Sequence, residues 1–405
     1  MPPTARPLLV AALLLLCAGQ STAQTTSPAP RPDLPALAQR IARTAAGVRP
    51  GDVVVVFGGK HTIPLMEAVA IEAQKSGGLV TMFLASDSVT RSSYRDVPEA
   101  YLSNKPEYFA QWVRSIDVWI GLPGEEDFES LLAGIPAERV AMVAEASQIL
   151  NQAINESGVR AVFVGYPSRQ QAAVNRLPYE RLERMHWAAV GADYEAIGRQ
   201  GRALQAALAG AREVRVTSPA GTDVTFSIGS RPVQVNDGVV SEEEAKGPVL
   251  LSRFASLPGG EVLVAPLESS AKGRVVVPRN RCKGAALADV SFELTAGKLG
   301  KLETGQGGDC LERELAAYSG PRDVFGWLTI GLNPALEVVE QGADYRPSAA
   351  AGMVYIGLGG NEMLGGENRT QGGYNFPIVG ATVVADGKVL VQDGRLVAGP
   401  TAARR

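Results

Sequence analysis

The chain has little histidine, cysteine or net charge, and each shortage excludes a class of function. Only two histidines occur in 405 residues, His61 and His186, and both lie in the first half. The second half therefore has no imidazole with which to bind a metal. A formal net charge of -3 leaves no basic surface of the kind that binds nucleic acid. No serine lies in the strand–turn–helix signature of a hydrolase nucleophile, and no cysteine has a histidine near it in sequence, so motifs give covalent catalysis no support.

Long hydrophobic runs are absent except near the N-terminus. Arg6 precedes an apolar run over residues 8–18, and Ser21 and Ala23 follow at the −3 and −1 positions of a cleavage site. A charged start, a short apolar core and a small-residue site are typical of a secretory signal peptide, and the run is too short to span a bilayer. We therefore expect residues 1–23 to be removed and the mature chain to be exported, to the periplasm or outside the cell.

The residues around the expected cleavage site bear on anchoring. Cys17 is a possible lipidation site, but Leu16 occupies the position before it, which usually needs a small residue, so we expect no lipid anchor. Residues 24–35 are rich in Pro, Ser and Thr and are expected to form a disordered leader. No later stretch is apolar enough to span a membrane, so no transmembrane segment is expected in the mature chain.

Two cysteines, Cys282 and Cys310, remain after the signal peptide. In an oxidising compartment a disulfide between them would close a loop and contribute roughly 3 kcal/mol to stability. Two free buried thiols are the alternative. The sequence leaves both open and favours the bridge.

The first half alternates strands and helices. A continuous β-branched run over residues 53–57 is typical of a buried parallel strand. Other strands are expected at 79–84, 116–121 and 160–164, with helices at 63–75, 107–114 and 189–211. This order predicts an open, doubly wound α/β domain over residues 36–211.

The second half reads as short strands and turns, and the length of the chain suits two domains. Two Asp-Gly pairs, at 386–387 and 393–394, are favoured hairpin corners because they tolerate positive φ. We predict a mostly antiparallel α+β domain over residues 212–400. Its expected strands are 213–216, 222–228, 261–265, 273–277, 290–294, 354–358, 381–385 and 388–392, with a helix at 310–319.

The Gly58-Gly59 turn after the first strand is one candidate anion site, because a helix N-terminus follows it. The full dinucleotide fingerprint is absent, and a plain tight turn is the alternative. His61 follows at the carboxyl end of the strand, where open α/β sheets have their clefts. His186, beside Trp187, is expected at the surface or in packing.

Several motifs of the second half occur in a particular order. PAGTDVTFSIGSR begins at Pro219, LPGGEVLVAP at Leu257, IGLNP at Ile330 and GMVYIGLGGNEMLGGENRTQGGYNF at Gly352. In this order they resemble the thermophilic metalloaminopeptidases of the aminopeptidase T or leucyl aminopeptidase type. GVRPGDVVVV at residues 47–56 is similar to that family's opening strand. The resemblance implies that family's α/β domain followed by a β-rich domain, and a tendency to form homodimers.

The resemblance also implies two divalent metals in the second domain. The family's ligands are a Glu in the LPGGEV segment, a Glu before IGLNP, a His in the next strand, and a His-x-Asp pair after the Gly-Gly-Asn segment. The metals supply an acidified water that hydrolyses a peptide at neutral pH. Carried over one by one, these positions fall on Glu261, Trp327, Tyr355, Gly373 and Asn375, with Tyr374 between the last two.

Only the first of these positions keeps its ligand. Trp327 and Gly373 offer no ligand atom, and neutral Tyr355 and Asn375 are poor substitutes for His and Asp. Two metals need about six to eight protein donor atoms, and Glu261 is the one carboxylate that matches. We therefore expect no metal cofactor. Zinc, cobalt or manganese is expected only if activity has been retained.

Other interpretations stay open. A hard cation such as calcium is one, with oxygen ligands from Glu261, Glu362, Glu367, Asn361, Asn368 and Asn375, the two loop glutamates being otherwise solvated charges. The new aromatic residues either form a pocket for an apolar ligand or fill the vacated space, since cavities cost stability.

The favoured hypothesis is an exported, non-catalytic relative, a pseudoenzyme, that binds a small molecule or peptide in a cleft at the degenerate site. The alternative is an active metal-dependent aminopeptidase, or another hydrolase, with an altered site. A related dioxygenase branch uses His and Asp to hold iron, and the same losses count against that activity. The expected cleft residues are Glu261, Trp327, Tyr355, Gly373, Tyr374 and Asn375.

Overall fold

A helix that was not expected begins within the residues assigned to the leader. The computed structural model describes residues 32–247, 250–318, 320–370 and 372–397, so the expected signal peptide and most of the leader lie outside the described residues. Helix α1 (Leu34–Gln39) starts where Asp33 accepts a hydrogen bond from the Ala36 amide, with Pro35 in its first turn. The leader expected through residue 35 is therefore two residues too long. Within the described ranges, no helix is long and apolar enough to cross a membrane.

The first half builds a five-stranded parallel sheet, sheet A, in the order β2-β1-β3-β4-β8. Its fifth strand comes from beyond residue 212, so the expected boundary at 211/212 does not separate this sheet from the second half. No strand was expected over the residues of β8, whose pairing with β4 lies across that boundary. The strands are β1 (Val53–Gly59), β2 (Leu79–Ala85), β3 (Val118–Gly121), β4 (Arg160–Val164) and β8 (Phe254–Leu257).

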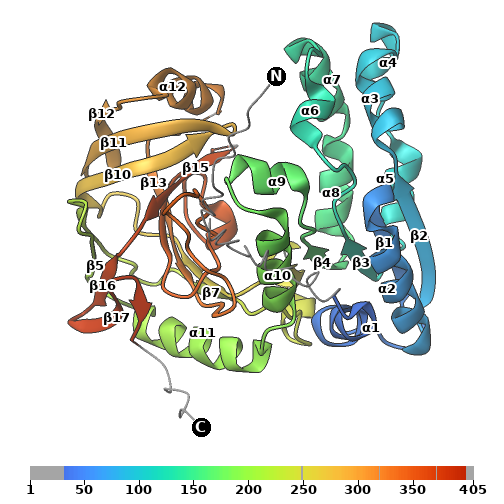
Figure 1. Ribbon diagram of the computed structural model, residues 1–405, viewed down its shortest axis with the longest axis horizontal. Coiled ribbons are helices and arrows are strands. Elements are labelled where there is room, and N and C mark those ends of the chain that lie inside the picture. Colours follow the sequence, from blue (N-terminus) through green and yellow to red (C-terminus); the bar gives the residue numbers. More distant parts are fainter. Residues whose placement is uncertain (1–31, 248–249, 319, 371, 398–405) are drawn as a thin grey trace, which may run out of the picture. The chain divides into compact units, whose positions relative to one another are not determined.

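Helices cover both faces of sheet A, as the alternating pattern predicts. On one face, α2 (Ile63–Lys75) buries Leu65 and Met66 in the same core as Val54 and Val56. On the other, α5 (Glu107–Val113) and α8 (Gln148–Glu156) pack beside Val55. Figure 1 shows these two helices continuing into two neighbouring columns of helices. The columns contain α3 (Asp87–Arg95), α4 (Glu99–Leu102), α6 (Phe128–Leu132) and α7 (Ala137–Ala146).

The helix expected over residues 189–211 is instead two helices. Helix α10 (Tyr179–Val190) follows α9 (Arg169–Val174) and ends before Gly191, and α11 (Tyr194–Leu208) starts anew. Asp193 forms the break, because its side chain accepts from the Ala196 amide at 2.9 Å as an N-cap.

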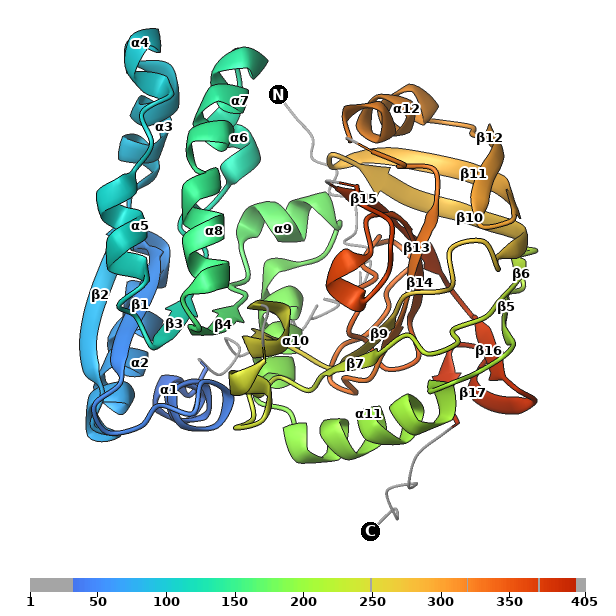
Figure 2. The same ribbon diagram turned by 180° about the vertical axis from the view of Figure 1, so that it is seen from behind.

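The second half forms two antiparallel sheets. Sheet B has the order β12-β11-β10-β6-β5-β16-β17-β18 and sheet C the order β15-β14-β13-β9-β7, which can be followed from behind in Figure 2. The expected Asp-Gly corners are confirmed, with positive φ at Asp386 and Asp393. The strands of sheet B are β5 (Val214–Thr217), β6 (Asp223–Phe226), β10 (Lys272–Cys282), β11 (Ala285–Thr295), β12 (Lys298–Glu303), β16 (Thr382–Ala385), β17 (Lys388–Gln392) and β18 (Arg395–Leu396).

Sheet C carries the positions singled out by the sequence. Its strands are β7 (Val233–Asn236), β9 (Glu261–Val264), β13 (Phe325–Gly331), β14 (Val354–Gly359) and β15 (Gly373–Ile378). Beside sheet B, Cys282 at the end of β10 forms a disulfide with Cys310 of α12 (Gly308–Ala317). The favoured pairing of the two cysteines is thereby confirmed.

Candidate functional site

Sheet C has one apolar face and one mixed face, because side chains alternate along each strand. Val262, Ile330 and Ile356 point to the apolar face and are buried. The strand register places five of the six expected site residues on the opposite face. These five are Glu261, Trp327, Tyr355, Gly373 and Asn375, and we call the surface they share the mixed face.

Tyr374 is the exception, and its expected place in the cleft is wrong. It lies between Gly373 and Asn375 on β15, so alternation turns it to the apolar face. Its ring centroid is 5.0 Å from that of Phe376, its hydroxyl donates to the Arg281 carbonyl, and burial raises its pKa. Tyr374 is a core residue.

The Trp327 indole closes one end of the mixed face. Its Nε1 donates a hydrogen bond to Oδ1 of Asn375 at 2.9 Å. Its ring lies so close to two glycines that a Cβ at Gly357 would sit 1.9 Å from Trp327 Cε2, and one at Gly373 would sit 2.3 Å from Cη2. No side chain fits at either position while the ring is there. We call Trp327, Gly357, Gly373 and Asn375 the closed end.

Tyr355 stands beside the closed end with its hydroxyl already bonded. The hydroxyl donates to the Arg346 carbonyl at 2.6 Å, and burial raises the pKa of Tyr355 to about 12. The Arg346 guanidinium is itself buried and pairs with Asp344 and with Glu340. The phenol is thus neutral at physiological pH and held in place.

Glu261 lies at the other end, and there the protein is hollow. Burial raises its pKa, against the opposing influence of the nearby Ser348 and Asn236 side chains. It lines a cavity of about 650 Å³ bounded by β7, β8, β9 and α11. We call Glu261, Asn236, Asp237 and this cavity the open end.

Acidic groups outnumber basic groups in the cavity. Among the residues that the structure describes, its lining holds the acidic side chains of Asp237, Glu243, Glu244 and Glu261, against the guanidinium of Arg202. Arg202 lies 3.5 Å from Asp237. Burial, with the nearby charge of Glu244, raises the pKa of Asp237. A cationic group entering the cavity would find carboxylates that the protein itself leaves largely uncompensated.

The residues present do not fit a two-metal centre. In the part of the chain that the structure describes, no three His, Cys, Asp or Glu side chains are grouped so as to hold a metal ion. The Trp327 indole is a donor only, and Oδ1 of Asn375 and the hydroxyl of Tyr355 are engaged as described. Glu261 lies on β9 and Asn375 on β15, three strands away in sheet C. At ordinary strand spacing the backbones of these two strands are roughly 14 Å apart.

The residues do not fit a calcium site either, because the side-chain amides of Asn361 and Asn368 are used in hydrogen bonds that hold the loop in a turn. Asn361 Oδ1 accepts from the Asn368 amide at 2.8 Å, and Asn368 Nδ2 donates to the carbonyls of Pro321 and Gly359. Glu362 pairs with Arg369, and the Glu367 side chain is 82% exposed. The loop glutamates are solvated charges, as the alternative interpretation held.

The glycine turn and His186 of the first half have structural explanations. A Cβ at Gly59 would lie 2.1 Å from the Gly124 carbonyl oxygen, so the close approach of two backbones explains the glycine. His61 lies edge-on to Tyr166, with centroids 5.6 Å apart. His186 is buried with Nε2 2.8 Å from the Gly165 carbonyl, and burial lowers its pKa to about 4. The packing interpretation of His186 is confirmed and the surface one is wrong.

Several site residues gave no signal in the sequence. Asn236, Asp237 and Ser348 sit far from Glu261 along the chain and belong to no recognised motif. Asn333, by contrast, lies in the IGLNP segment and is fully buried. Its Nδ2 donates to the carbonyls of Ala189 and Gly259, so it joins that segment to LPGGEV. The motif therefore has a structural role that its sequence alone did not reveal.

Known proteins match the chain over most of its length. A family model described as thermophilic metalloprotease (M29) matches residues 31–324. The wild-type AmpT of Thermus thermophilus superposes with a TM-score of 0.71 at 19% identity, covering 90% of this chain and 99% of that one. The 2,5-dihydroxypyridine dioxygenase of Pseudomonas putida KT2440 superposes with a TM-score of 0.59 at 18% identity, covering 91% and 97%. These two likenesses show the fold alone. No curated protein matches.

Proposed function

Because this chain belongs to the thermophilic metalloprotease (M29) family, we propose that it is an exported, non-catalytic relative of those enzymes that binds a small molecule or peptide at the open end. One observation carries the proposal. The four altered ligand positions hold groups that offer no donor or are already engaged, whereas the Glu261 position opens on a cavity of about 650 Å³. That volume is in the range of small-molecule sites.

The ligand we favour has a free amine. Four carboxylates line the cavity against one guanidinium. The Glu261 carboxylate, near the Ser348 and Asn236 side chains, has lone pairs for a donor. The amino terminus of a short peptide would supply the positive charge and the donors together.

The test compares two peptides on three proteins by isothermal titration calorimetry. One dipeptide has a free amino terminus, and the matched control has the same sequence with an N-acetyl group. We expect the free peptide to bind and the acetylated one to bind at least tenfold more weakly, as for a lost charge-assisted hydrogen bond. Glu261→Gln should weaken the free peptide by about tenfold, while Trp327→Phe at the closed end should not. Equal affinity for the two peptides would contradict the proposal.

Family membership favours an active metal-dependent aminopeptidase as the second candidate. Its test is hydrolysis of leucine p-nitroanilide with added zinc, cobalt or manganese. Metal-dependent release of nitroaniline that survives repurification would establish that candidate. We expect no release above the rate in buffer.

Export and self-association are separate parts of the proposal. N-terminal sequencing of the protein purified from its own cells should begin at Gln24, and a start at Met1 would contradict export. Light scattering after gel filtration should give the mass of a homodimer.

A further inference from the structure

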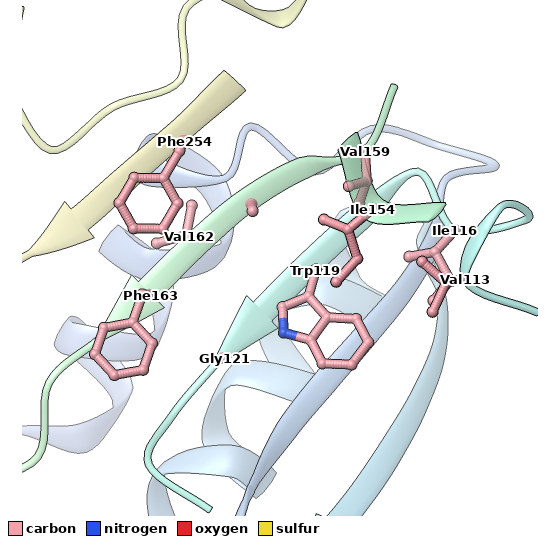
Figure 3. A pocket seen from close by; sticks show the side chains of 10 residues that line it. Val113, Ile116, Trp119, Gly121, Ile154, Val159, Val162, Phe163 and Phe254 are labelled. Atoms are coloured by element: carbon pink, nitrogen blue, oxygen red, sulfur yellow. The ribbon is translucent and has the colours of Figure 1, made fainter. Parts of the chain in front are cut away.

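Sheet A carries a second cavity, unrelated to sheet C. It has a volume of about 170 Å³ and lies against β3, β4 and β8, with residues of α5 and α8 in its wall (Figure 3). None of its ten lining residues has a charged side chain. The residues that matter to its shape are Val113, Trp119, Ile154, Ala161, Phe163 and Phe254.

The alternation of large and small side chains produces the cavity. The register places Ala161 between Trp119 and Phe254 in one row across three strands. In the next row Gly121 pairs with Phe163. A Cβ at Gly121 would lie 3.0 Å from Trp119 Nε1, so the glycine lets the indole lie over its neighbour. The methyl group of Ala161 and the hydrogen of Gly121 lie among three aromatic rings and are too small to fill the space between them.

One polar side-chain atom faces this space, the Trp119 Nε1. No residue that the structure describes accepts a hydrogen bond from it. Figure 3 shows the nitrogen on the edge of the ring that faces Phe163 and Gly121. The Phe57 ring, with its centroid 5.6 Å from that of Trp119, holds the indole from the other side. The donor is therefore fixed in direction and open.

We infer that this cavity binds a small, uncharged aromatic molecule with a single hydrogen-bond acceptor. An apolar cavity of about 150 Å³ accommodates benzene, so this one has room for a ring and one or two further atoms. Aromatic walls favour a flat ring through offset and edge-on contacts, and an acceptor on it would satisfy the indole N–H. Phe163 is 43% exposed, so the cavity is reached from solvent on its side.

Two isosteric probes separate the apolar part of the inference from the polar part. Ethylbenzene and anisole have the same size and shape, and they differ by a methylene group in place of an ether oxygen. Their dissociation constants are measured by calorimetry on the purified protein. Both are expected to bind. If neither binds up to its solubility limit, the inference is overturned.

Two variants then test whether the probes bind in this cavity. Ala161→Leu fills the floor and should weaken both probes at least tenfold. Tyr108→Ala, in a neighbouring hollow whose lining includes Trp119, alters a residue that is 80% exposed and absent from this cavity, and should change neither. If Ala161→Leu folds and binds both probes unchanged, they sit elsewhere and the inference fails.

Trp119→Phe decides the matter if Ala161→Leu does not fold. It removes the N–H and keeps an aromatic wall. Anisole should lose threefold to tenfold more affinity than ethylbenzene, the range of one neutral hydrogen bond. An equal loss for both probes would overturn the assignment of the indole as the recognising group.

Discussion

The two ends of the mixed face differ at the positions that the family resemblance assigns to metal ligands. At the closed end an indole packs on two glycines and donates a hydrogen bond to Asn375, so that the space there is filled. At the open end Glu261 keeps its carboxylate and faces a cavity lined by other acids. The sequence left two outcomes open, a new pocket or a filled one. The filled outcome applies at Trp327, whereas the lining of the cavity at Glu261 includes none of the three new aromatic residues.

Removing the disulfide is expected to have the largest effect on stability, because residues next to Cys282 hydrogen-bond to β15, which carries part of the closed end. Beside Cys282, the Arg281 carbonyl accepts from Tyr374, and Asn280 Nδ2 donates to the Asn375 carbonyl at 2.9 Å. Replacing both cysteines by serine should lower the free energy of unfolding by about 3 kcal/mol. Chemical denaturation measures the loss.

Hydrogen exchange in the same variant tests whether the two ends are independent. Amides of β15 should exchange faster, while those of β7 and β9 at the open end should not change. Faster exchange over all of sheet C would mean that the two ends are one cooperative unit.

The next effect comes from the contact between Gly357 and Trp327. Gly357→Ala should cost about 2 kcal/mol, because its methyl group would overlap the indole ring. In a Trp327→Ala background the same change should cost almost nothing, since the ring is gone. The double-mutant cycle gives the coupling directly. Additive costs would show that the indole does not lie on Gly357.

The smallest effect is expected in the contribution of Asp237, at the open end, to the pH dependence of stability. Burial raises the pKa of Asp237 above its value in the unfolded chain. Between the two pKa values the folded protein holds a proton that the unfolded chain has released, so this group's contribution to stability falls as pH rises through that window.

Asp237→Asn removes that contribution. The variant should therefore gain stability relative to the wild type as pH rises from 4 to 7. The matched control is Trp327→Phe, since the closed end has no titratable side chain, and its cost should be the same at both pH values. A gain with pH in the control, or none in Asp237→Asn, would contradict the assignment.

The sequence was informative where a pattern lies within one segment. The β-branched run of β1 and the Asp-Gly corners predicted local structure, and the motif order predicted the family. It failed where strands from distant segments meet. Tyr374 was misplaced because no strand was expected over residues 373–378, so the alternation of side chains along β15 was not applied. The cavity at Glu261 was missed because Asn236 and Ser348 come from other segments, and β8 because its pairing with β4 lies across the expected domain boundary.

Metal content tests the central claim most directly. The purified protein is incubated with zinc, cobalt and manganese in turn, passed through a desalting column and measured by inductively coupled plasma mass spectrometry. The altered donors of the mixed face predict far less than one equivalent of each metal per chain. One or two tightly bound equivalents, lost on replacing Glu261 by Gln, would show that a metal centre survives and would contradict the account.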